Sequence, residues 1–180
     1  WITNDKQTYE ILEKAGVKVY MKWSLSGLFY CLTSGVYIYT HGVGDINFAT
    51  SGNTFKINLW HGIGWKKIEY LAQLSWVNLN NPLHRIIYPF YCVRHDLFLS
   101  TSPFYSQLAK DCFKLDENRI IYGFPPRCVT RNFSGEEIEN HCSQFDPVSL
   151  RYINKAREYR KVFFYMPTYR DFTNQNILEF

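Results

Sequence analysis

The sequence predicts an α/β fold built on a parallel sheet. Short apolar runs alternate with amphipathic stretches along the chain, in the rhythm of strands and helices that follow one another. The chain has 180 residues, of which 46% are hydrophobic and 20% are charged. This length and composition suit one packed domain, or one domain and the start of another, and they argue against intrinsic disorder.

Strands are expected where Val, Ile, Leu, Tyr and Phe gather in short runs. The expected strands cover residues 17–21, 36–39, 55–59, 97–99, 120–122 and 162–166. The polar residues Lys56 and Asn58 in the third of these runs indicate that only one face of that strand is fully buried.

Helices are expected in the amphipathic stretches between these runs. They cover residues 8–15, 25–33, 65–73, 104–113 and 148–159. Gly16 ends the first helix, and Ser24 caps the second, which Gly35 follows. Ser102 caps the fourth helix, with Pro103 in its first turn.

The net charge of +4 is mildly basic, and no nucleic-acid partner is expected from it. Basic residues gather in the segment 151–170, which favours an anionic ligand or an anionic membrane face, although a solvated helix face explains most of them equally well. The longest apolar stretch, residues 27–39, is interrupted and falls short of the roughly 20 residues of a spanning helix. Neither a membrane span nor a secretory signal is therefore expected.

The five cysteines are odd in number and form no C-x-x-C pair, so neither a disulfide framework nor a zinc ribbon is expected. Reduced thiols in the cytoplasm are the better interpretation. No carboxylate cluster demands a metal, and we expect no metal and no separate cofactor. Dinucleotide-binding G-x-G-x-x-G, Walker and G-x-S-x-G motifs are absent from the sequence.

Ligands of parallel α/β sheets bind beyond the carboxyl ends of the strands, and this rule selects the candidate site residues. In chain order, those nearest the strand ends are His41, His61, Ser102, Arg127, Thr168 and Arg170.

His61 is the strongest candidate. It follows a strand directly, and Gly62 and the lysines Lys66 and Lys67 come soon after it. A histidine there can accept a proton near neutral pH, while the lysines can neutralise phosphate. The alternative, a structural histidine with exposed lysines, is equally good on these residues alone.

The other candidates each have an ordinary explanation as well. The start of the helix at Ser102 attracts anions, but an ordinary N-cap is the more common case. Arg127 stands on a stiff proline turn and suits a phosphate, or it is simply solvated. Thr168 and Arg170 suit a phosphorylated ligand, unless Asp171 pairs with the arginine. His41 lies in a glycine-bearing loop without a firm interpretation.

Four segments, in order, resemble the CDP-glycerol glycerophosphotransferases, the teichoic-acid primases and polymerases. Residues 58–68 (NLWHGIGWKKI) resemble the family's W-H-G-T-P-L-K segment, and residues 164–171 (FYMPTYRD) resemble L-Y-x-P-T-[WFY]-R-D. Between them, Ser102-Pro103 resembles a serine-containing turn of the family, and residues 123–127 (GFPPR) resemble G-[FY]-P-R. The resemblance extends from about residue 10 to residue 171.

The resemblance implies a GT-B-like fold with two Rossmann-like lobes. Residues 1–147 would form the acceptor-side lobe, trimmed at its N-terminus, and residues 148–180 a linking helix and the start of the CDP-donor-binding lobe. The implied reaction moves glycerol phosphate, or a related alditol phosphate, from a CDP-alditol to a hydroxyl of a teichoic-acid-like or capsule polymer and releases CMP. The implied acceptor is lipid-linked and anionic, which would place the protein at the inner face of the cell membrane as a peripheral protein.

The resemblance also assigns roles to the candidate residues. His61 would be the catalytic base for the acceptor hydroxyl. The donor or its phosphates would be bound by Arg127, Thr168, Arg170 and Ser102. The acceptor side would hold Lys66, Lys67 and His41.

The chain also departs from the family pattern. Ile63, Gly64 and Trp65 replace the Thr, Pro and Leu that follow H-G, and an extra proline precedes Arg127. The family has a second functional histidine downstream of P-T-x-R-D, and the sequence stops at Phe180 before such a position. We therefore expect a partial chain that has no turnover by itself. A GT-B glycosyltransferase that uses a nucleotide sugar and a non-catalytic module that binds an anionic polymer or membrane are the alternatives.

Overall fold

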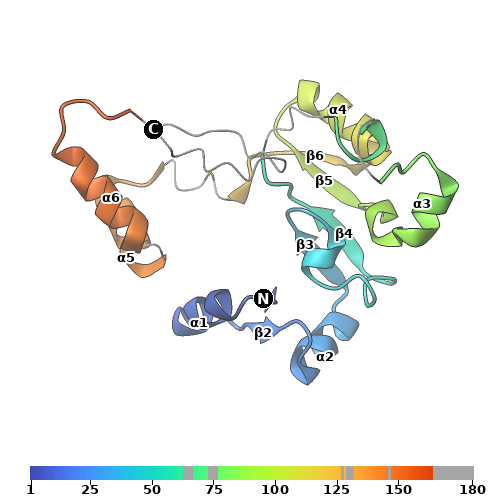
Figure 1. Cartoon of the computed structure of the whole chain (residues 1–180), viewed down its shortest axis with the longest axis horizontal. Coiled ribbons are helices and arrows are strands. Elements are labelled where there is room, and N and C mark those ends of the chain that lie inside the picture. The colour runs from blue at the N-terminus through green and yellow to red at the C-terminus, as the bar shows by residue number, and fades with distance from the viewer. Residues whose placement is uncertain (63–66, 73–76, 127, 129–131, 146, 164–180) are drawn as a thin grey trace, which may run out of the picture. The chain divides into compact units, whose positions relative to one another are not determined.

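The computed structural model describes residues 1–62, 67–72, 77–126, 128, 132–145 and 147–163 (Figure 1). The chain forms two compact units, residues 1–134 and residues 135–180, and each is described by itself.

The first unit begins with a small parallel sheet around one helix. Strand β1 (Ile2–Thr3) pairs with β2 (Tyr20–Met21), and α1 (Lys6–Lys14) lies between them in the sequence. The Asp5 carboxylate caps α1 by accepting a hydrogen bond from the Thr8 N–H at 2.6 Å. The helix ends before Gly16, whose φ of +76° is left-handed, as the sequence predicted. The expected strand at 17–21 is shortened to its last two residues.

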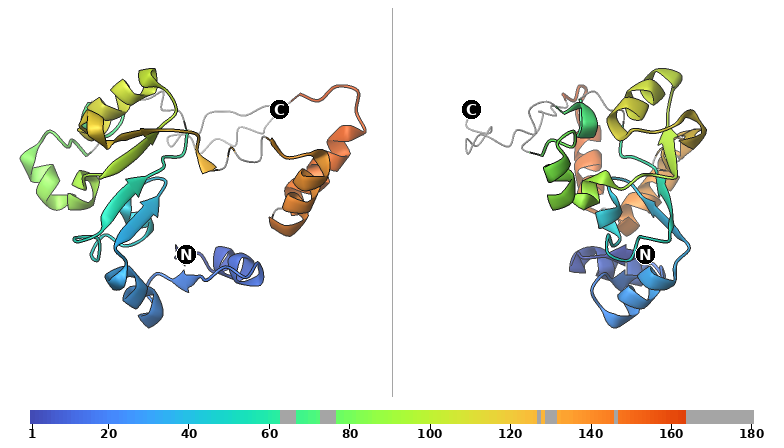
Figure 2. Two further views of the ribbon diagram at one scale, coloured as in Figure 1. Left: turned by 180° about the vertical axis from the view of Figure 1, so that it is seen from behind. Right: turned by 90° about the vertical axis from the view of Figure 1, so that its right-hand side faces the viewer.

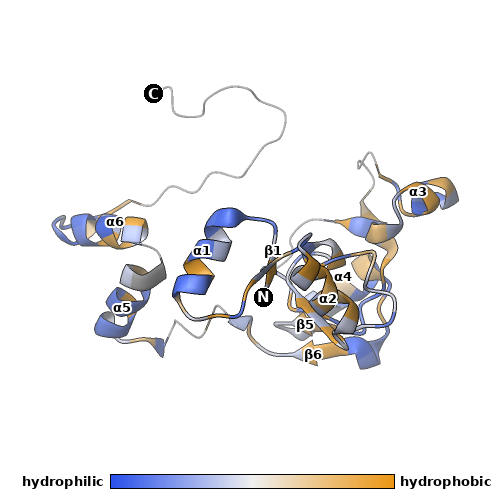
Figure 3. Cartoon of the chain, turned by 90° about the horizontal axis from the view of Figure 1, so that it is seen from below, coloured by the Kyte–Doolittle hydropathy of each residue, from blue (hydrophilic) through white to orange (hydrophobic). Residues whose placement is uncertain are grey.

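Helix α2 (Leu25–Thr33) matches its predicted bounds. The Ser24 hydroxyl accepts a hydrogen bond from the Gly27 N–H at 3.0 Å and so caps the helix. Gly27 is required here, because a Cβ at this position would lie 2.0 Å from the Met21 carbonyl oxygen. The helix carries no charged residue and is mostly orange in Figure 3.

The main sheet of the first unit is four-stranded and parallel, with the strands in chain order. Its members are β3 (Val36–Tyr39), β4 (Phe55–Asn58), β5 (Leu97–Ser100) and β6 (Ile120–Tyr122). Each agrees with its predicted bounds to within one residue, and the predicted parallel α/β architecture is confirmed.

Helix α4 (Pro103–Phe113) joins β5 to β6 and packs against β5 (Figure 2). Its cap at Ser102 and its Pro103 start are as predicted. Among the described residues, the other connections hold a short helix α3 (Pro82–Ile87) and the 3₁₀ turns η1 (Val43–Asp45), η2 (Glu69–Leu71) and η3 (Pro89–Cys92). A further 3₁₀ turn, η4 (Glu117–Arg119), lies between α4 and β6. The helix expected at 65–73 is therefore wrong for its described part, which contains only η2.

Two groups of buried side chains form the core of this unit. Phe98 on β5 is fully buried and clusters with Trp60 and with Tyr105 and Ala109 of α4. The second group lies at β3, where Tyr37 and Tyr39 pack with Cys31 of α2 and Val43.

The prediction for strand β4 needs a correction. Asn58, expected on the solvent side, is 0% exposed, whereas the apolar Phe55 is 45% exposed. The reason is that the Asn58 amide is satisfied by hydrogen bonds inside the protein, so its burial carries no large desolvation penalty.

The second unit is a pair of helices, α5 (Gly135–Phe145) and α6 (Pro147–Arg157), that pack against each other. The Arg157 guanidinium donates to the Glu139 carboxylate between them. Helix α6 agrees with its prediction to within two residues, and α5 was not expected. The expected lobe boundary after residue 147 stays a prediction. Val162 and Phe163 form no strand, and the rest of the strand expected at 162–166 lies outside the described residues.

Within the part of the chain that the structure describes, none of the helices is both long enough and apolar enough to span a membrane.

Candidate active site

The loops that follow β3 and β4 bring two histidines together. The parallel register pairs Tyr39 with Asn58, so both strands end at the same edge of the sheet. The rings of His41 and His61, which come soon after these two ends, lie 5.7 Å apart between centroids and are nearly perpendicular. Both side chains are exposed at this edge.

Trp60 anchors the loop from which His61 projects. Its indole ring is 8% exposed and packs edge-on against Phe113, with 5.1 Å between centroids. The same ring contacts the His61 imidazole at 4.2 Å and lies parallel to the His41 ring at 6.4 Å. The φ of Trp60 is +53°, a left-handed conformation that costs a non-glycine residue about 1–2 kcal/mol. Burial of the ring holds this conformation and turns His61 toward solvent.

The buried side chain of Asn58 forms hydrogen bonds with both loops that carry the exposed histidines. Its Oδ1 accepts a hydrogen bond from the Trp60 N–H at 2.8 Å, and its Nδ2 donates to the His41 carbonyl oxygen at 3.2 Å. The same Nδ2 lies 3.3 Å from Nε2 of His95, and Nδ1 of His95 lies 2.7 Å from the Tyr39 hydroxyl oxygen. A buried chain of polar groups therefore runs beneath the exposed histidines.

Burial sets the protonation of this chain. It lowers the pKa of His95 to about 4, an effect that nearby Asp96 only partly opposes, so the ring is neutral at pH 7. Burial also raises the pKa of Tyr39, and the carboxylates of Asp96 and Asp45 add to that rise. Tyr39 is therefore a neutral phenol.

The loop that carries His41 is held by its own side chains and by a lysine. The Asp45 carboxylate accepts hydrogen bonds from the N–H groups of His41 at 3.1 Å and Gly42 at 3.3 Å. The nearly buried Lys22 donates to the Gly44 carbonyl oxygen. These contacts fix the backbone on one side of the histidine pair.

A cavity of about 150 Å³ adjoins His41, with Glu69, His95 and Phe113 in its lining. Glu69 has a left-handed φ of +48°. Burial raises the pKa of its carboxyl, and the neighbouring His41 partly offsets this rise. The cavity thus places the Glu69 carboxyl and the buried His95 imidazole beside the exposed histidine pair.

Ser102 stands at the end of β5, and its hydroxyl caps α4. It accepts a hydrogen bond from the Tyr105 N–H at 3.2 Å, while the Ser102 carbonyl oxygen accepts from the hydroxyls of Ser100 and Ser106. This geometry is that of an ordinary N-cap, and the anion-binding role of Ser102 stays a prediction.

A family model described as CDP-Glycerol:Poly(glycerophosphate) glycerophosphotransferase matches residues 1–179 of the chain. The chain belongs to this family. No curated protein and no solved structure matches the chain significantly. The family is one of transferases, and its general activity is CDP-glycerol glycerophosphotransfer. The resemblance predicted from the four sequence segments is confirmed.

The remaining candidates of the family pattern are only partly described. Lys67 is exposed in the loop after His61. Lys66, Arg127, Thr168 and Arg170 lie outside the described residues, so their roles in phosphate binding stay predictions.

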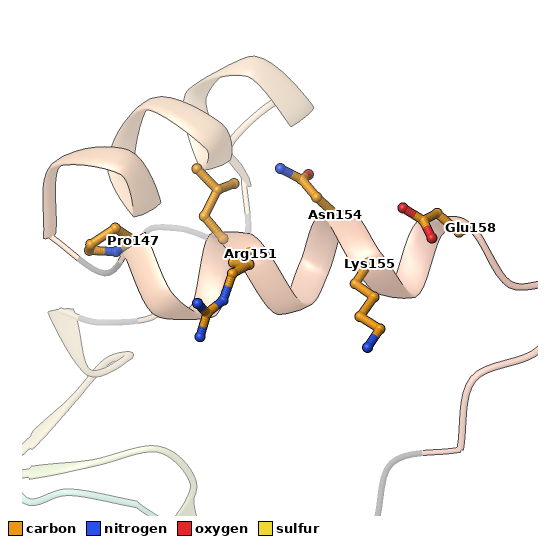
Figure 4. A pocket seen from close by; sticks show the side chains of 6 residues that line it. Pro147, Arg151, Asn154, Lys155 and Glu158 are labelled. Atoms are coloured by element: carbon orange, nitrogen blue, oxygen red, sulfur yellow. The ribbon is translucent and has the colours of Figure 1, made fainter.

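A second hollow runs along α6 in the other unit, where Arg151 and Lys155 project from the same side of the helix (Figure 4). All of its lining residues belong to α6 and the residue after it, so it is a helix surface and not an enclosed site.

Sequence reasoning gave little weight to the residues beneath the site. The rule of strand ends selected neither His95 nor Tyr39 nor Glu69 as a candidate site residue. One signal was available for Asn58, because a polar residue ends an apolar strand just before Trp60-His61. Polar groups at that point of a parallel sheet commonly serve the site above them.

Proposed function

We propose that the protein transfers glycerol phosphate, or a related alditol phosphate, from a CDP-alditol to a hydroxyl of a teichoic-acid-like or capsule polymer, with release of CMP. The observation that carries the proposal is the exposed imidazole of His61 at the carboxyl edge of β4, beside His41, in a member of this transferase family. Ligands of parallel sheets bind at that edge.

His61 acts as the general base in this reaction. It accepts the proton of the acceptor hydroxyl while the oxygen attacks the phosphorus that carries the alditol. The bond between that phosphorus and the bridging oxygen breaks, and CMP departs with the bonding electrons. General-base assistance of this kind contributes about 10²–10⁴-fold to the rate.

The cationic and hydroxyl side chains supply the electrostatic part of catalysis. Arg127, Thr168, Arg170 and Ser102 are assigned to the donor and its diphosphate, and Lys66, Lys67 and His41 to the acceptor side. Phosphoryl transfer depends mainly on alignment and charge neutralisation, which such groups provide. No metal ion or separate cofactor is part of the proposal.

The acceptor is a lipid-linked anionic polymer, and the protein works at the cytoplasmic face of the membrane. The net charge of +4 supports this placement, because an anionic polymer and an anionic leaflet both attract a basic protein.

The test is CMP release from CDP-glycerol by the full-length protein in the presence of a polymer acceptor. His61→Ala is expected to lower kcat by about 10²–10⁴-fold, with the KM for CDP-glycerol kept within about threefold, because the variant loses only the base. His84→Ala is the matched control, since His84 lies on α3 and not at a strand end, and its Nδ1 accepts a hydrogen bond from the Asn78 N–H.

Three outcomes would contradict the proposal. UDP release from a UDP-sugar, without CMP release from any CDP-alditol, would assign the chain to nucleotide-sugar transfer. Polymer binding without turnover would indicate a binding module. Full activity in His61→Ala would remove His61 from the catalytic role.

A further inference from the structure

The side-chain amide of Asn58 is fully buried, and each of its polar hydrogens and its oxygen faces a partner. Oδ1 accepts from the Trp60 N–H, one N–H of Nδ2 donates to the His41 carbonyl, and the other faces Nε2 of His95. The two backbone contacts fix the orientation of the amide. A flipped amide would place NH₂ against the N–H of Trp60 and oxygen against the carbonyl of His41.

This orientation determines the tautomer of His95. Because Nδ2 of Asn58 is a donor, Nε2 of His95 must accept, and the proton of the neutral ring is on Nδ1. Nδ1–H then donates to the Tyr39 hydroxyl oxygen at 2.7 Å. The direction of hydrogen bonding is therefore set from Asn58 to His95 and from His95 to Tyr39.

The hydrogen bonds among Asn58, His95 and Tyr39 form a relay that links three neighbouring segments of the sheet and ends at the site. Tyr39 is on β3, Asn58 is on β4, and His95 comes two residues before β5. Its outer ends are the carbonyl oxygen of His41 and the N–H of Trp60. Those two backbone groups belong to the residues that place the His41 and His61 rings.

We propose that Asn58, His95 and Tyr39 are positioning residues that hold the His61 imidazole in place for proton abstraction. The inference rests on the proposed function. Trp60 needs support because its left-handed φ of +53° is unfavourable for a non-glycine residue, and the Asn58 oxygen faces the Trp60 N–H only while the contacts of Nδ2 with His41 and His95 hold the amide in place. A displacement of about 1 Å at a catalytic group can lower the rate about 10²-fold.

Asn58→Asp is the sharpest test, because it keeps an oxygen for the Trp60 N–H and removes the donor to His41 and His95. We expect kcat for CMP release from CDP-glycerol to fall about 10–100-fold, with the KM for CDP-glycerol within about threefold. The ¹⁵N spectrum of the histidine rings supplies a second readout. In the wild type, His95 shows Nδ1 protonated and Nε2 unprotonated, and in Asn58→Asp the proton is on Nε2.

His95 variants test the same relay without changing Asn58. His95→Gln offers an amide oxygen to Nδ2 of Asn58 and is expected to keep kcat within about fivefold. His95→Leu offers no acceptor and is expected to lose about as much kcat as Asn58→Asp. This pair also keeps the inference testable if Asn58→Asp does not fold.

Two buried tyrosines on the same strand provide the matched control. The Tyr39 hydroxyl belongs to the relay, whereas the Tyr37 hydroxyl bonds to the Cys31 carbonyl oxygen at 2.8 Å and to the Thr50 hydroxyl at 2.7 Å. Tyr39→Phe is expected to lower kcat several-fold. Tyr37→Phe is expected to lower the melting temperature and leave kcat unchanged.

Wild-type kcat in Asn58→Asp, or a wild-type spectrum with the His95 proton on Nε2, would overturn the inference. Equal kcat in His95→Leu and His95→Gln would do the same. If the wild-type protein releases no CMP from any CDP-alditol, the proposed function fails instead, and the histidine spectrum still decides whether the relay exists.

Discussion

A single buried polar residue, Asn58, contacts the backbone of the residues that place the two exposed histidines. Amides in the interior are tolerated where every donor and acceptor is satisfied, and the contacts of Asn58 meet that condition. The sequence showed the polar residue in an apolar strand, but not its partners. His95 is 37 residues away in the sequence, and only the sheet brings the two together. For this reason His61 and His41 could be proposed from position alone, while the residues beneath them could not.

Burial of a neutral histidine makes stability depend on pH. The pKa of His95 is about 4 in the folded protein against 6.5 for an ordinary histidine. Between these values the unfolded state binds more protons than the folded state, so stability is lost as the pH falls from about 6.5 to about 4. The wild type should lose about 3 kcal/mol of unfolding free energy over this range relative to His95→Gln. Urea unfolding of both proteins between pH 4 and pH 7.5 measures the difference.

The comparison with His95→Gln removes the contribution of the other titrating groups, which both proteins share. A difference in unfolding free energy that stays constant with pH would show that His95 is protonated equally in the folded and unfolded states.

For helices and strands, the predicted bounds agree with the structure where capping or turn residues mark the ends of the element. Helix α2 and strand β3 match their predicted bounds because Ser24 caps the helix and the Ser34-Gly35 pair separates it from the strand. The shortest elements were missed, since β1 and α3 are too brief for a periodic pattern. Helix α5 was missed although the sequence at 134–137 (SGEE) is a capping-box signature.

Helix α4 ends in a conformation that its residue does not favour. Lys114 caps the C-terminus with a φ of +54°, where glycine is the common residue. Lys114→Gly is expected to raise the unfolding free energy by about 0.5–1 kcal/mol relative to Lys114→Ala, because both variants lose the contact of the lysine with the Tyr70 ring and only glycine relieves the strain. Denaturant unfolding measures the difference. A glycine variant that is less stable than the alanine variant would show that the left-handed conformation of residue 114 is not strained.

At the scale of the whole molecule, the family match covers both units, whereas the described site lies in the first unit alone. Apart from Ser102, the residues assigned to the donor are Arg127 and those at 164–171, which lie outside the described residues. The acceptor-side prediction could therefore be compared with geometry at His41 and Lys67, and the donor-side prediction at Ser102 alone. Motif order along the chain was sufficient to identify the family because it does not depend on how the segments are placed in space.

The proposed membrane location makes a prediction about charge. Arg151 and Lys155 lie one turn apart on α6 and project from the same side, so both can approach an anionic surface together (Figure 4). Each cation near such a surface contributes about 1 kcal/mol, and the double variant Arg151→Gln, Lys155→Gln should bind vesicles rich in anionic lipid roughly 30-fold more weakly. Vesicle co-sedimentation at low and high salt measures this, because screening weakens the attraction in the wild type.

The matched control is the double variant Lys6→Gln, Lys14→Gln on α1, which lowers the net charge equally but in the other unit. If attraction came only from the net charge of +4, both double variants would weaken binding to the same extent. A larger loss for the α6 variant would identify that helix face as the part that meets the membrane. Equal binding of the wild type and both double variants to anionic vesicles would show that the basic face of α6 is a solvated helix surface and not a membrane-binding one.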